Sequence, residues 1–493
     1  MSKKIISIDQ GTTSSRAVLF DEKCNLIDIE QKELTQFFPS DGWVEHDPEE
    51  IWSSVLEVTK RIIDKHKIDF SDIGSIGITN QRETTLLWDK RTGKTVYPAI
   101  VWQDRRTSDF CDDLRKNGLD DDIHYKTGLL IDPYFSATKL SWILNNIEGV
   151  RKKAEAGYLA FGTVDCFLLW RLTEGKHHKT DATNASRTML FNINKNKWDV
   201  ELLKIFDIPE TILPEVCDNI HAFGETKLFG GSIKIGGIAG DQQAALIGQC
   251  CFEPGEAKST YGTGCFLLVN TGKEKLTSKN KLLSTIAYRF DGQTIYGLEG
   301  SIFVAGSAVQ WLRDSLKLFQ SASETEEIIK LRNMDSKALV VPSFTGLGAP
   351  HWDPRARGAI FGLSRDSGIP ELTAATLESI AFQTKSLILS MIKDGANFKE
   401  LRVDGGMAKN SWFVQNLANT LDLTVLRPKE VETTALGVAF LAGINCGLLP
   451  DIESLNSIRF SQKTFKPKRD KVDTQNKKFS TWLKAVERTK GLF

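Results

Sequence analysis

Two short segments, one at the start of the chain and one just past its middle, share a single layout. Each has an apolar strand, a tight turn rich in glycine and hydroxyl side chains, and a second apolar strand. The first is "ISIDQGTTSSRAVLF" (6–20) and the second is "AKSTYGTGCFLLV" (257–269). Each pattern predicts a β-hairpin. Because the layout recurs while the letters differ, we predict a duplicated fold in which each lobe opens with such a hairpin.

The length of the chain also favours two lobes. It has 493 residues, whereas single hydrophobic cores stop growing at roughly 250–300 residues. Strand and helix patterns alternate throughout, which predicts an α/β fold. We place the boundary near 248–255, before the second hairpin, and expect two domains, residues 1–250 and 251–493.

Several local elements follow from the pattern. We expect an antiparallel start from three strands and a further strand at 76–78. The segment 46–66 predicts a helix that Asp47 caps, with Pro48 at its first position and Glu50 three residues after the cap. The Lys-rich tail after Thr464 is interpreted as a solvated surface helix. The three opening strands are expected at 5–8, 17–20 and 26–30.

Composition excludes several classes of partner. Lys plus Arg equals Asp plus Glu, 63 against 63, so no nucleic acid or anionic membrane is expected. The eight cysteines form no C-x-x-C pair and are interpreted as buried thiols without disulfides. The chain enters a strand at once and has no apolar run of about 18 residues. We therefore expect a cytoplasmic protein.

The tip of the first hairpin offers hydrogen-bond donors. A Gly-Thr turn exposes backbone N–H groups, Thr12, Thr13 and Ser14 add hydroxyls, and Arg16 adds a guanidinium. Such a group of donors suits phosphate oxygens. Asp9, at the end of the strand, is of the type that holds Mg²⁺ through water. The alternative is a plain polar hairpin.

A second candidate lies in "IAGDQQAALIGQ", where a strand at 233–239 leads into a helix of small residues. Asp241 would stand at the mouth of a cleft, ready to accept a hydroxyl proton, and the helix N-terminus would keep it ionised. The alternative is that Asp241 only caps the helix.

Two further patterns are weaker. Arg82-Glu83 follow a strand and place a donor beside an acceptor, which suits a small polyol; the alternative is a surface ion pair. After a strand at 401–403, a Gly-Gly turn lets a flat ring or a phosphate approach the backbone. Gly306 and Gln310 share one helix face, and an ordinary core contact explains them equally well.

Two long motifs give the sequence a resemblance to the FGGY carbohydrate kinases. They are "YFSATKLSWILNN" (134–146) and "GAIFGLSRDSGIPELTAATLE" (358–378). The resemblance runs from Ile5 to about Leu449. Shorter segments, among them "DQGTTSSRA", "GITNQRETT" and "GIAGDQQAAL", resemble the members of the family that phosphorylate glycerol.

The resemblance implies a two-lobed fold of the actin and hexokinase type, built from duplicated ribonuclease H-like domains with a cleft between the lobes. It implies ATP-dependent phosphorylation of glycerol to sn-glycerol 3-phosphate, with ADP released, in glycerol catabolism. Mg²⁺ would accompany ATP, and the protein would form a dimer or tetramer. The lobes would close about a hinge near the domain boundary.

The resemblance also assigns residues. Asp241 would accept the hydroxyl proton, and Asp9 would lie beside the magnesium ion. The hydroxyls of glycerol would bond to Arg82, Glu83, Tyr134, Asp241 and Gln242, and its carbons would pack on Trp102 and Phe266. Phosphates would bind Thr12, Thr13, Ser14, Arg16 and Thr263. The rest of the nucleotide would lie on Gly306, Gln310, Gly406 and Asn410.

Two regulatory features of relatives are not matched. Ser232 stands where relatives inhibited by fructose 1,6-bisphosphate carry an Arg, and Lys227 stands where others carry a phosphorylatable His. Two other functions stay open at the level of sequence. One is an FGGY kinase acting on a pentose, a tetritol or dihydroxyacetone. The other is a non-metabolic ATPase of the same fold.

Overall fold

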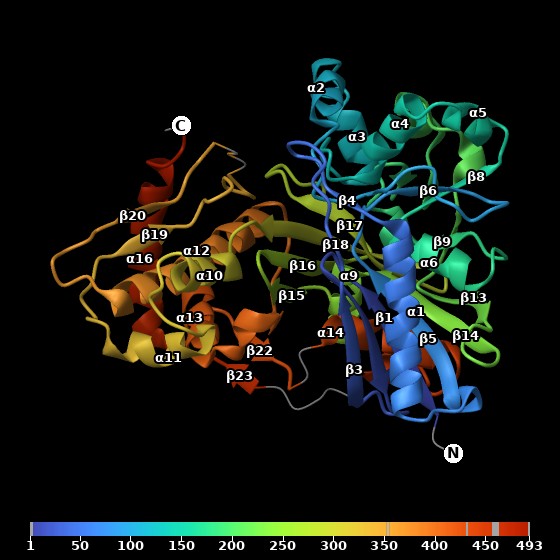
Figure 1. Ribbon diagram of the computed structural model, residues 1–493. Coiled ribbons are helices and arrows are strands. Elements are labelled where there is room, and N and C mark those ends of the chain that lie inside the picture. The colour runs from blue at the N-terminus through green and yellow to red at the C-terminus, as the bar shows by residue number, and fades with distance from the viewer. Residues whose placement is uncertain (1–2, 352, 354, 430–431, 456–462, 492–493) are drawn as a thin grey trace.

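The computed structural model describes residues 3–351, 353, 355–429, 432–455 and 463–491, and two mixed β-sheets form the centres of two lobes (Figure 1). The first sheet has the order β13-β14-β5-β1-β2-β3. Its strands β1, β2 and β3 are antiparallel, whereas β5 runs parallel to both β1 and β14. The strands are β1 (Lys4–Gln10), β2 (Ser14–Phe20), β3 (Leu26–Glu33), β5 (Ile73–Asn80), β13 (Ile220–Thr226) and β14 (Ile233–Gly240).

The second sheet repeats this plan. Its order is β17-β18-β16-β15-β21-β22-β23, in which β15, β16 and β18 are antiparallel and β21 runs parallel to β15 and β22. The hairpin β15-β16 therefore corresponds to β1-β2, as the sequence predicts. The strands are β15 (Glu256–Tyr261), β16 (Cys265–Gly272), β17 (Leu283–Phe290), β18 (Gln293–Ile302), β21 (Glu400–Asp404), β22 (Val425–Arg427) and β23 (Lys463–Phe465).

Helices and short strands cover and connect the two sheets. The helices are α1 (Pro48–Lys65), α2 (Ser108–Lys116), α3 (Asp120–Thr127), α4 (Ser136–Asn146), α5 (Val150–Glu155), α6 (Val164–Leu172), α7 (Ala182–Ala185), α8 (Val200–Ile205), α9 (Asp241–Gly248), α10 (Gly306–Asp314), α11 (Thr325–Ile328), α12 (Ile369–Lys393), α13 (Ser411–Leu421), α14 (Thr433–Asn445), α15 (Ile452–Leu455) and α16 (Arg469–Glu487). The short strands are β4 (Glu45–His46), β6 (Leu86–Asp89), β7 (Ala99–Ile100), β8 (Leu159–Gly162), β9 (Lys179–Asp181), β10 (Phe191–Asn192), β11 (Lys197–Trp198), β12 (Glu215–Cys217), β19 (Leu339–Val341) and β20 (Ala359–Phe361).

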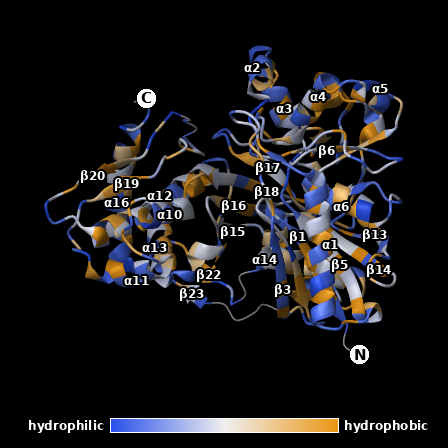
Figure 2. Ribbon diagram, in the orientation of Figure 1, coloured by the Kyte–Doolittle hydropathy of each residue, from blue (hydrophilic) through white to orange (hydrophobic). Residues whose placement is uncertain are grey.

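Helix α1 begins as its sequence predicts. Asp47 is the N-cap, its side chain accepts from the N–H of Glu49, and Pro48 is the first helical residue. Glu50 does not complete a capping box, because its carboxylate accepts instead from the backbone N–H and hydroxyl of Thr35. The helix shows hydrophobic and hydrophilic residues side by side in Figure 2, and its buried face includes Val55.

One helix from the C-terminal half belongs spatially to the first lobe. Helix α14 packs against β1, β5, β14 and α9, and in Figure 1 it lies with the strands of that lobe. Two glycines allow the contact with α9, because a Cβ at Gly248 or at Gly437 would stand 1.9 Å from a backbone oxygen of the other helix. The lobes are thus joined by more than one passage of the chain.

The C-terminal helix corrects one prediction. Helix α16 forms in the Lys-rich tail, but it is not simply a solvated helix. Trp482 on its inner face is fully buried, and its indole N–H donates to the carbonyl oxygen of Val340 at 2.9 Å. Only the outer face of the helix is solvated.

All eight cysteines fall within the described residues, and none of them forms a disulfide. Seven are buried and Cys446 is partly exposed, so the sequence interpretation holds for seven of them in full. Among the described residues, the helices are each too short or too polar to pass through a lipid bilayer.

Candidate active site

A cavity of about 150 Å³ lies where the two sheets approach each other. It unites every residue that the sequence assigns to glycerol, together with one residue of the first hairpin tip. Seven of the lining residues come from the first lobe, and Phe266 comes from β16 of the second. The lining is Thr12, Arg82, Glu83, Trp102, Tyr134, Asp241, Gln242 and Phe266.

The first sheet explains why these side chains meet. Thr12, Arg82 and Asp241 each come just after one of the neighbouring parallel strands β1, β5 and β14. The carboxyl ends of parallel strands lie at one edge of a sheet, which is where ligands bind in open α/β folds. Glu83 needs an unusual backbone to join them, because its φ of +63° lies in the left-handed region.

Two cations, Arg82 and Lys258, act on Asp241. Its Oδ1 is 3.1 Å from Nε of Arg82, and 34% of its side chain remains exposed, toward the cavity that it lines. Burial raises the pKa of Asp241, while Arg82 and Lys258 act in the opposite direction. The alternative that Asp241 only caps the helix is wrong, because Gly240 is the N-cap and Asp241 is the first helical residue. The ionisation of Asp241 therefore depends on burial, Arg82 and Lys258 as well as on the helix N-terminus.

A buried ion cluster across the two sheets supports the cavity. Nη1 of Arg82 donates to Glu299 on β18 at 2.6 Å, and Nη2 of Arg187 donates to the same carboxylate at 2.9 Å. Arg187 also donates to Glu83 at 2.6 Å. Burial alone would raise the pKa of Glu299, but Arg187 and Arg82 lower it to about 2. The alternative of a surface ion pair for Arg82-Glu83 is wrong, because both side chains are at most 2% exposed.

Aromatic rings form the apolar walls. Trp102 lies edge-on to Tyr134, with ring centroids 5.5 Å apart, and to Phe266, with centroids 6.4 Å apart. Lys139 holds the backbone around Tyr134. Its ammonium donates to three consecutive carbonyls, those of Pro133, Tyr134 and Phe135.

The tip of the first hairpin contacts both the cavity and an acidic pair. The hydroxyl of Thr12 accepts from the indole N–H of Trp102 at 2.8 Å. Arg16 donates to Asp9 and, at 2.6 Å, to Glu432. Thr13 is exposed and Ser14 is half-buried.

The predicted nucleotide residues lie outside the cavity and belong to the second lobe. Thr263 is exposed at the β15-β16 tip, and its carbonyl accepts from the N–H groups of Ala305 and Ser307 at the start of α10. A Cβ at Gly306 would stand 2.5 Å from the oxygen of Gly262, so the close approach of this tip requires glycine. The hairpin tip and the helix N-terminus thus form one surface.

The other residues predicted to bind the nucleotide differ in exposure and in their contacts within the protein. Gln310 is exposed, and a Cβ at Gly406 would meet no atom within 4 Å. Asn410 is engaged within the protein: its Oδ1 caps α13 by accepting from Phe413 at 2.8 Å, and its Nδ2 donates to Thr325 at 3.1 Å.

Three buried side chains of the site escape the sequence analysis: Arg187, Lys258 and Glu299. Lys258 donates to the side-chain oxygens of Gln242 and Thr260. Lys258 lies within the second hairpin segment (257–269), but the sequence analysis assigns no role to it, to Arg187 or to Glu299. The alternation of side chains along β15 and β18 turns Lys258 and Glu299 inward, and this pattern is the sequence signal that could have indicated those two residues.

Comparisons with known proteins cover both halves of the chain. The description "FGGY family of carbohydrate kinases, N-terminal domain" matches residues 4–248, and the corresponding C-terminal domain matches residues 257–446. A glycerol kinase of Marinomonas sp. is 55% identical over 492 residues, which cover 99% of each chain. Glycerol kinase 1 of Pseudomonas aeruginosa is 53% identical over 493 residues, which cover 100% of each.

Solved structures show the same fold. A crystal structure of Plasmodium falciparum glycerol kinase with ADP superimposes with a TM-score of 0.93 at 38% identity, covering 99% of this chain and 98% of that one. A gluconate kinase from Lactobacillus acidophilus shares the fold at 24% identity, with a TM-score of 0.89. The fold and the site define a two-lobed kinase of the actin and hexokinase type, as predicted. The chain belongs to the FGGY family of carbohydrate kinases.

Proposed function

We propose that this enzyme transfers the γ-phosphoryl group of ATP to a terminal hydroxyl of glycerol, which gives sn-glycerol 3-phosphate and ADP. One observation supports the proposal: a single small cavity is lined by both Asp241 and Thr12, so the proposed alcohol site would adjoin the proposed phosphate-binding turn. The curated relatives that match the whole chain are named glycerol kinases.

The cavity suits a short polyol. Its volume of about 150 Å³ is below the roughly 300–1,000 Å³ typical of drug-sized ligands. Trp102 and Phe266 cover carbon atoms, while Arg82, Glu83 and Tyr134 offer donors and acceptors. A buried site that hydrogen-bonds each hydroxyl strongly rejects an analogue that lacks one, because its own polar groups are then left unpaired.

Asp241 would act at the reacting hydroxyl. As the oxygen–phosphorus bond forms and the bond from the γ-phosphorus to the β,γ-bridging oxygen breaks, the carboxylate accepts the hydroxyl proton. In phosphoryl transfer, positioning and charge stabilisation matter more than proton removal. Arg82 would hold the carboxylate in place for this step. It lies 3.1 Å from Asp241 and forms an ion pair with Glu299.

The two hairpin tips would hold the phosphates and the start of the nucleotide. Thr12, Thr13, Ser14 and Arg16 lie on one side and Thr263 on the other, with Gly306, Gln310, Gly406 and Asn410 beyond it. We assign the alcohol and phosphate site chiefly to residues 1–250 and the nucleotide to residues 251–493. Asn410 would keep its helix-capping role and contact the nucleotide beside it.

The donor set at Asp9 fits Mg²⁺ bound through water. Asp9 and Glu432 are carboxylates, the ligand type that Mg²⁺ takes, and both now face the same cation, Arg16. When bound with ATP, the ion would neutralise phosphate charge. Asp9 would orient its water, and Arg16 would turn toward the phosphate oxygens.

We further propose a dimer or tetramer, which the family resemblance implies and light scattering would test. We place the enzyme in the cytoplasm, where ATP and a reducing environment are available. Its eight cysteines, none of them in a disulfide, are the pattern of a reducing compartment.

The decisive experiment incubates the purified protein with MgATP and a panel of acceptors and detects the products. The acceptors are glycerol, dihydroxyacetone, erythritol, xylulose and gluconate. We expect kcat/KM to be highest for glycerol and the product to be sn-glycerol 3-phosphate. A higher value for a sugar would assign a different FGGY activity, and ATP hydrolysis indifferent to every acceptor would favour a non-metabolic ATPase.

A further inference from the structure

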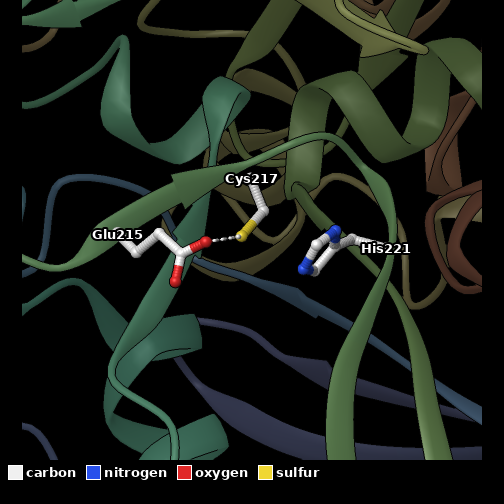
Figure 3. A group of neighbouring side chains, drawn as sticks. All are labelled: Glu215, Cys217 and His221. Carbon is white, nitrogen blue, oxygen red and sulfur yellow. Dashed lines mark hydrogen bonds between the residues drawn. The ribbon is translucent and has the colours of Figure 1, made fainter.

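Three potential metal ligands gather on the first lobe, apart from the cavity. They are Glu215 and Cys217 on β12 and His221 on β13 (Figure 3). Side chains two residues apart on a strand point to the same face, which brings Glu215 and Cys217 together. His221 reaches the same space from the next strand. None of the three lines the cavity that contains Asp241.

The ligand atoms are close enough to share one ion. The carboxylate oxygen, the sulfur and the ring nitrogen all lie within 4.8 Å of one another. Sγ of Cys217 is 3.7 Å from Oε1 of Glu215. Zinc bonds of about 2.0–2.3 Å place two ligand atoms at most about 4.6 Å apart, so small side-chain movements would complete the geometry.

A cation already stands at this position. Nζ of Lys179 is 3.2 Å from Nε2 of His221 and 3.7 Å from Oε2 of Glu215. An ammonium can only donate, so Nε2 of His221 accepts and directs its lone pair toward the cation. Lys179 thus marks the place where the protein presents electron pairs to a positive charge.

We propose that Glu215, Cys217 and His221 form a Zn²⁺ site, which the ion enters by displacing the ammonium of Lys179. A thiolate, an imidazole and a carboxylate make a donor set that favours Zn²⁺ over Mg²⁺ or Ca²⁺. On binding, the S–H bond of Cys217 breaks, sulfur keeps the electron pair, and one proton passes to solvent. Glu215 is exposed, so water takes the fourth position.

The site adjoins a contact between the lobes. Arg289 on β17 holds both β12 and the segment that follows it. Its Nη2 donates to the carbonyl of Val216 on β12 at 3.0 Å, and its backbone N–H donates to Oδ1 of Asn219 at 2.8 Å. A bound ion would therefore tie β12 to β13 beside this contact and stabilise the folded state by mass action.

Cobalt(II) is the probe for the test, because it occupies zinc sites and gives a thiolate-to-metal absorption band. The full-length protein is titrated with Co²⁺, which is then displaced by Zn²⁺. We expect one ion per chain with the thiolate band and a rise in thermal midpoint with Zn²⁺. Absence of the band, or of Zn²⁺ displacement, overturns the proposal.

Variants separate this site from adventitious binding. Cys217→Ser should abolish the band, and His221→Ala should weaken affinity at least about tenfold. Lys179→Met should bind more tightly than the wild type, because it removes the competing cation. Cys446→Ser is the matched control and should keep the band. A band that survives Cys217→Ser or vanishes with Cys446→Ser contradicts the proposal, as does unchanged affinity in Lys179→Met. Kinase activity reports that each variant is folded.

Discussion

Burial and two nearby cations act in opposite directions on the pKa of Asp241. Replacing it by Asn keeps the size of the side chain and an oxygen for Arg82, but removes the proton acceptor. We expect Asp241→Asn to retain measurable glycerol binding by calorimetry and to lose about a hundredfold to ten-thousandfold in kcat. The exposed Asp470→Asn is the control. Near wild-type turnover in Asp241→Asn would remove Asp241 from its proposed role.

Lys258 should help to keep the carboxylate of Asp241 ionised by lowering its pKa. Burial raises the pKa of Asp241 above the ordinary value of 3.8, and Lys258 is one of the two cations that lower it. Activity falls on the acid side when Asp241 becomes protonated. Lys258→Met should therefore move the acid limb of the kcat/KM profile to higher pH, measured from about pH 5 to 8. The exposed Lys484→Met should leave the limb unmoved, whereas a shift to lower pH in Lys258→Met would refute the argument.

Glu299 neutralises two buried guanidinium groups at once. Glu299→Gln leaves Arg82 and Arg187 without that charge, and breaking a buried pair costs about 3–5 kcal/mol. We expect a lower thermal midpoint and a higher KM for glycerol. The exposed Glu487→Gln is the control, and an unchanged midpoint in Glu299→Gln would contradict this account.

The pH dependence of that loss has a definite sign. The pKa of Glu299 is lowered to about 2 from an ordinary value of 4.5, so its stabilising charge is fully present above pH 4.5. The contribution disappears as the pH falls through the folded-state pKa. The difference in unfolding free energy between wild type and Glu299→Gln should accordingly be constant from neutral pH to about pH 5 and shrink below it.

The site could be predicted residue by residue only where a motif carries it. Asp241 follows a glycine at the end of β14, and Arg82 comes just after the end of β5, so the local sequence indicates both. Glu299 gives no such signal, because its partners lie 217 residues or 112 residues away in the chain. Its role arises from the packing of two sheets, which no local pattern encodes.

At the scale of elements, local chemistry predicts the beginnings of structures well. The hairpins and the cap of α1 follow from residues adjacent in sequence. The errors share one cause, which is competition from tertiary contacts. Glu50 bonds to Thr35 instead of closing a capping box, and Trp482 buries one face of a helix that carries five basic and three acidic residues.

The crossing of α9 and α14 fixes the helix that begins at Asp241. A Cβ on Gly437 would stand 1.9 Å from the carbonyl oxygen of Ala244, so Gly437→Ala must push the helices apart. Such overpacking costs about 1–3 kcal/mol or more. We expect a lower thermal midpoint together with reduced kcat. Gly368→Ala, where the nearest atom would be 3.5 Å away, is the control for added volume. Because Gly368 is the N-cap of α12, this variant should lower the midpoint slightly and leave kcat unchanged; equal effects in both variants would refute the role of the crossing.

At the scale of the whole molecule, two contacts at the cavity join the lobes. Arg82 forms an ion pair with Glu299, and Trp102 lies edge-on to Phe266. The duplicated topology was predictable from the two hairpins. The return of α14 to the first lobe was not predictable, because the helix is apolar on all sides and would suit any buried position.

These bridges bear on how the lobes close. The hairpin tips at 11–14 and 262–264 belong to different sheets, and a nucleotide whose phosphates contact both would draw the sheets together about the hinge predicted near 248–255. Closure would exclude water that otherwise attacks ATP. We expect glycerol plus a non-hydrolysable ATP analogue to protect both tips from hydrogen exchange and to reduce the radius of gyration in X-ray scattering. The analogue alone should do less, and the turn at 291–292, outside the cavity, should not change. Equal protection without glycerol, or an unchanged radius with both ligands, would show that the lobes do not close on the alcohol.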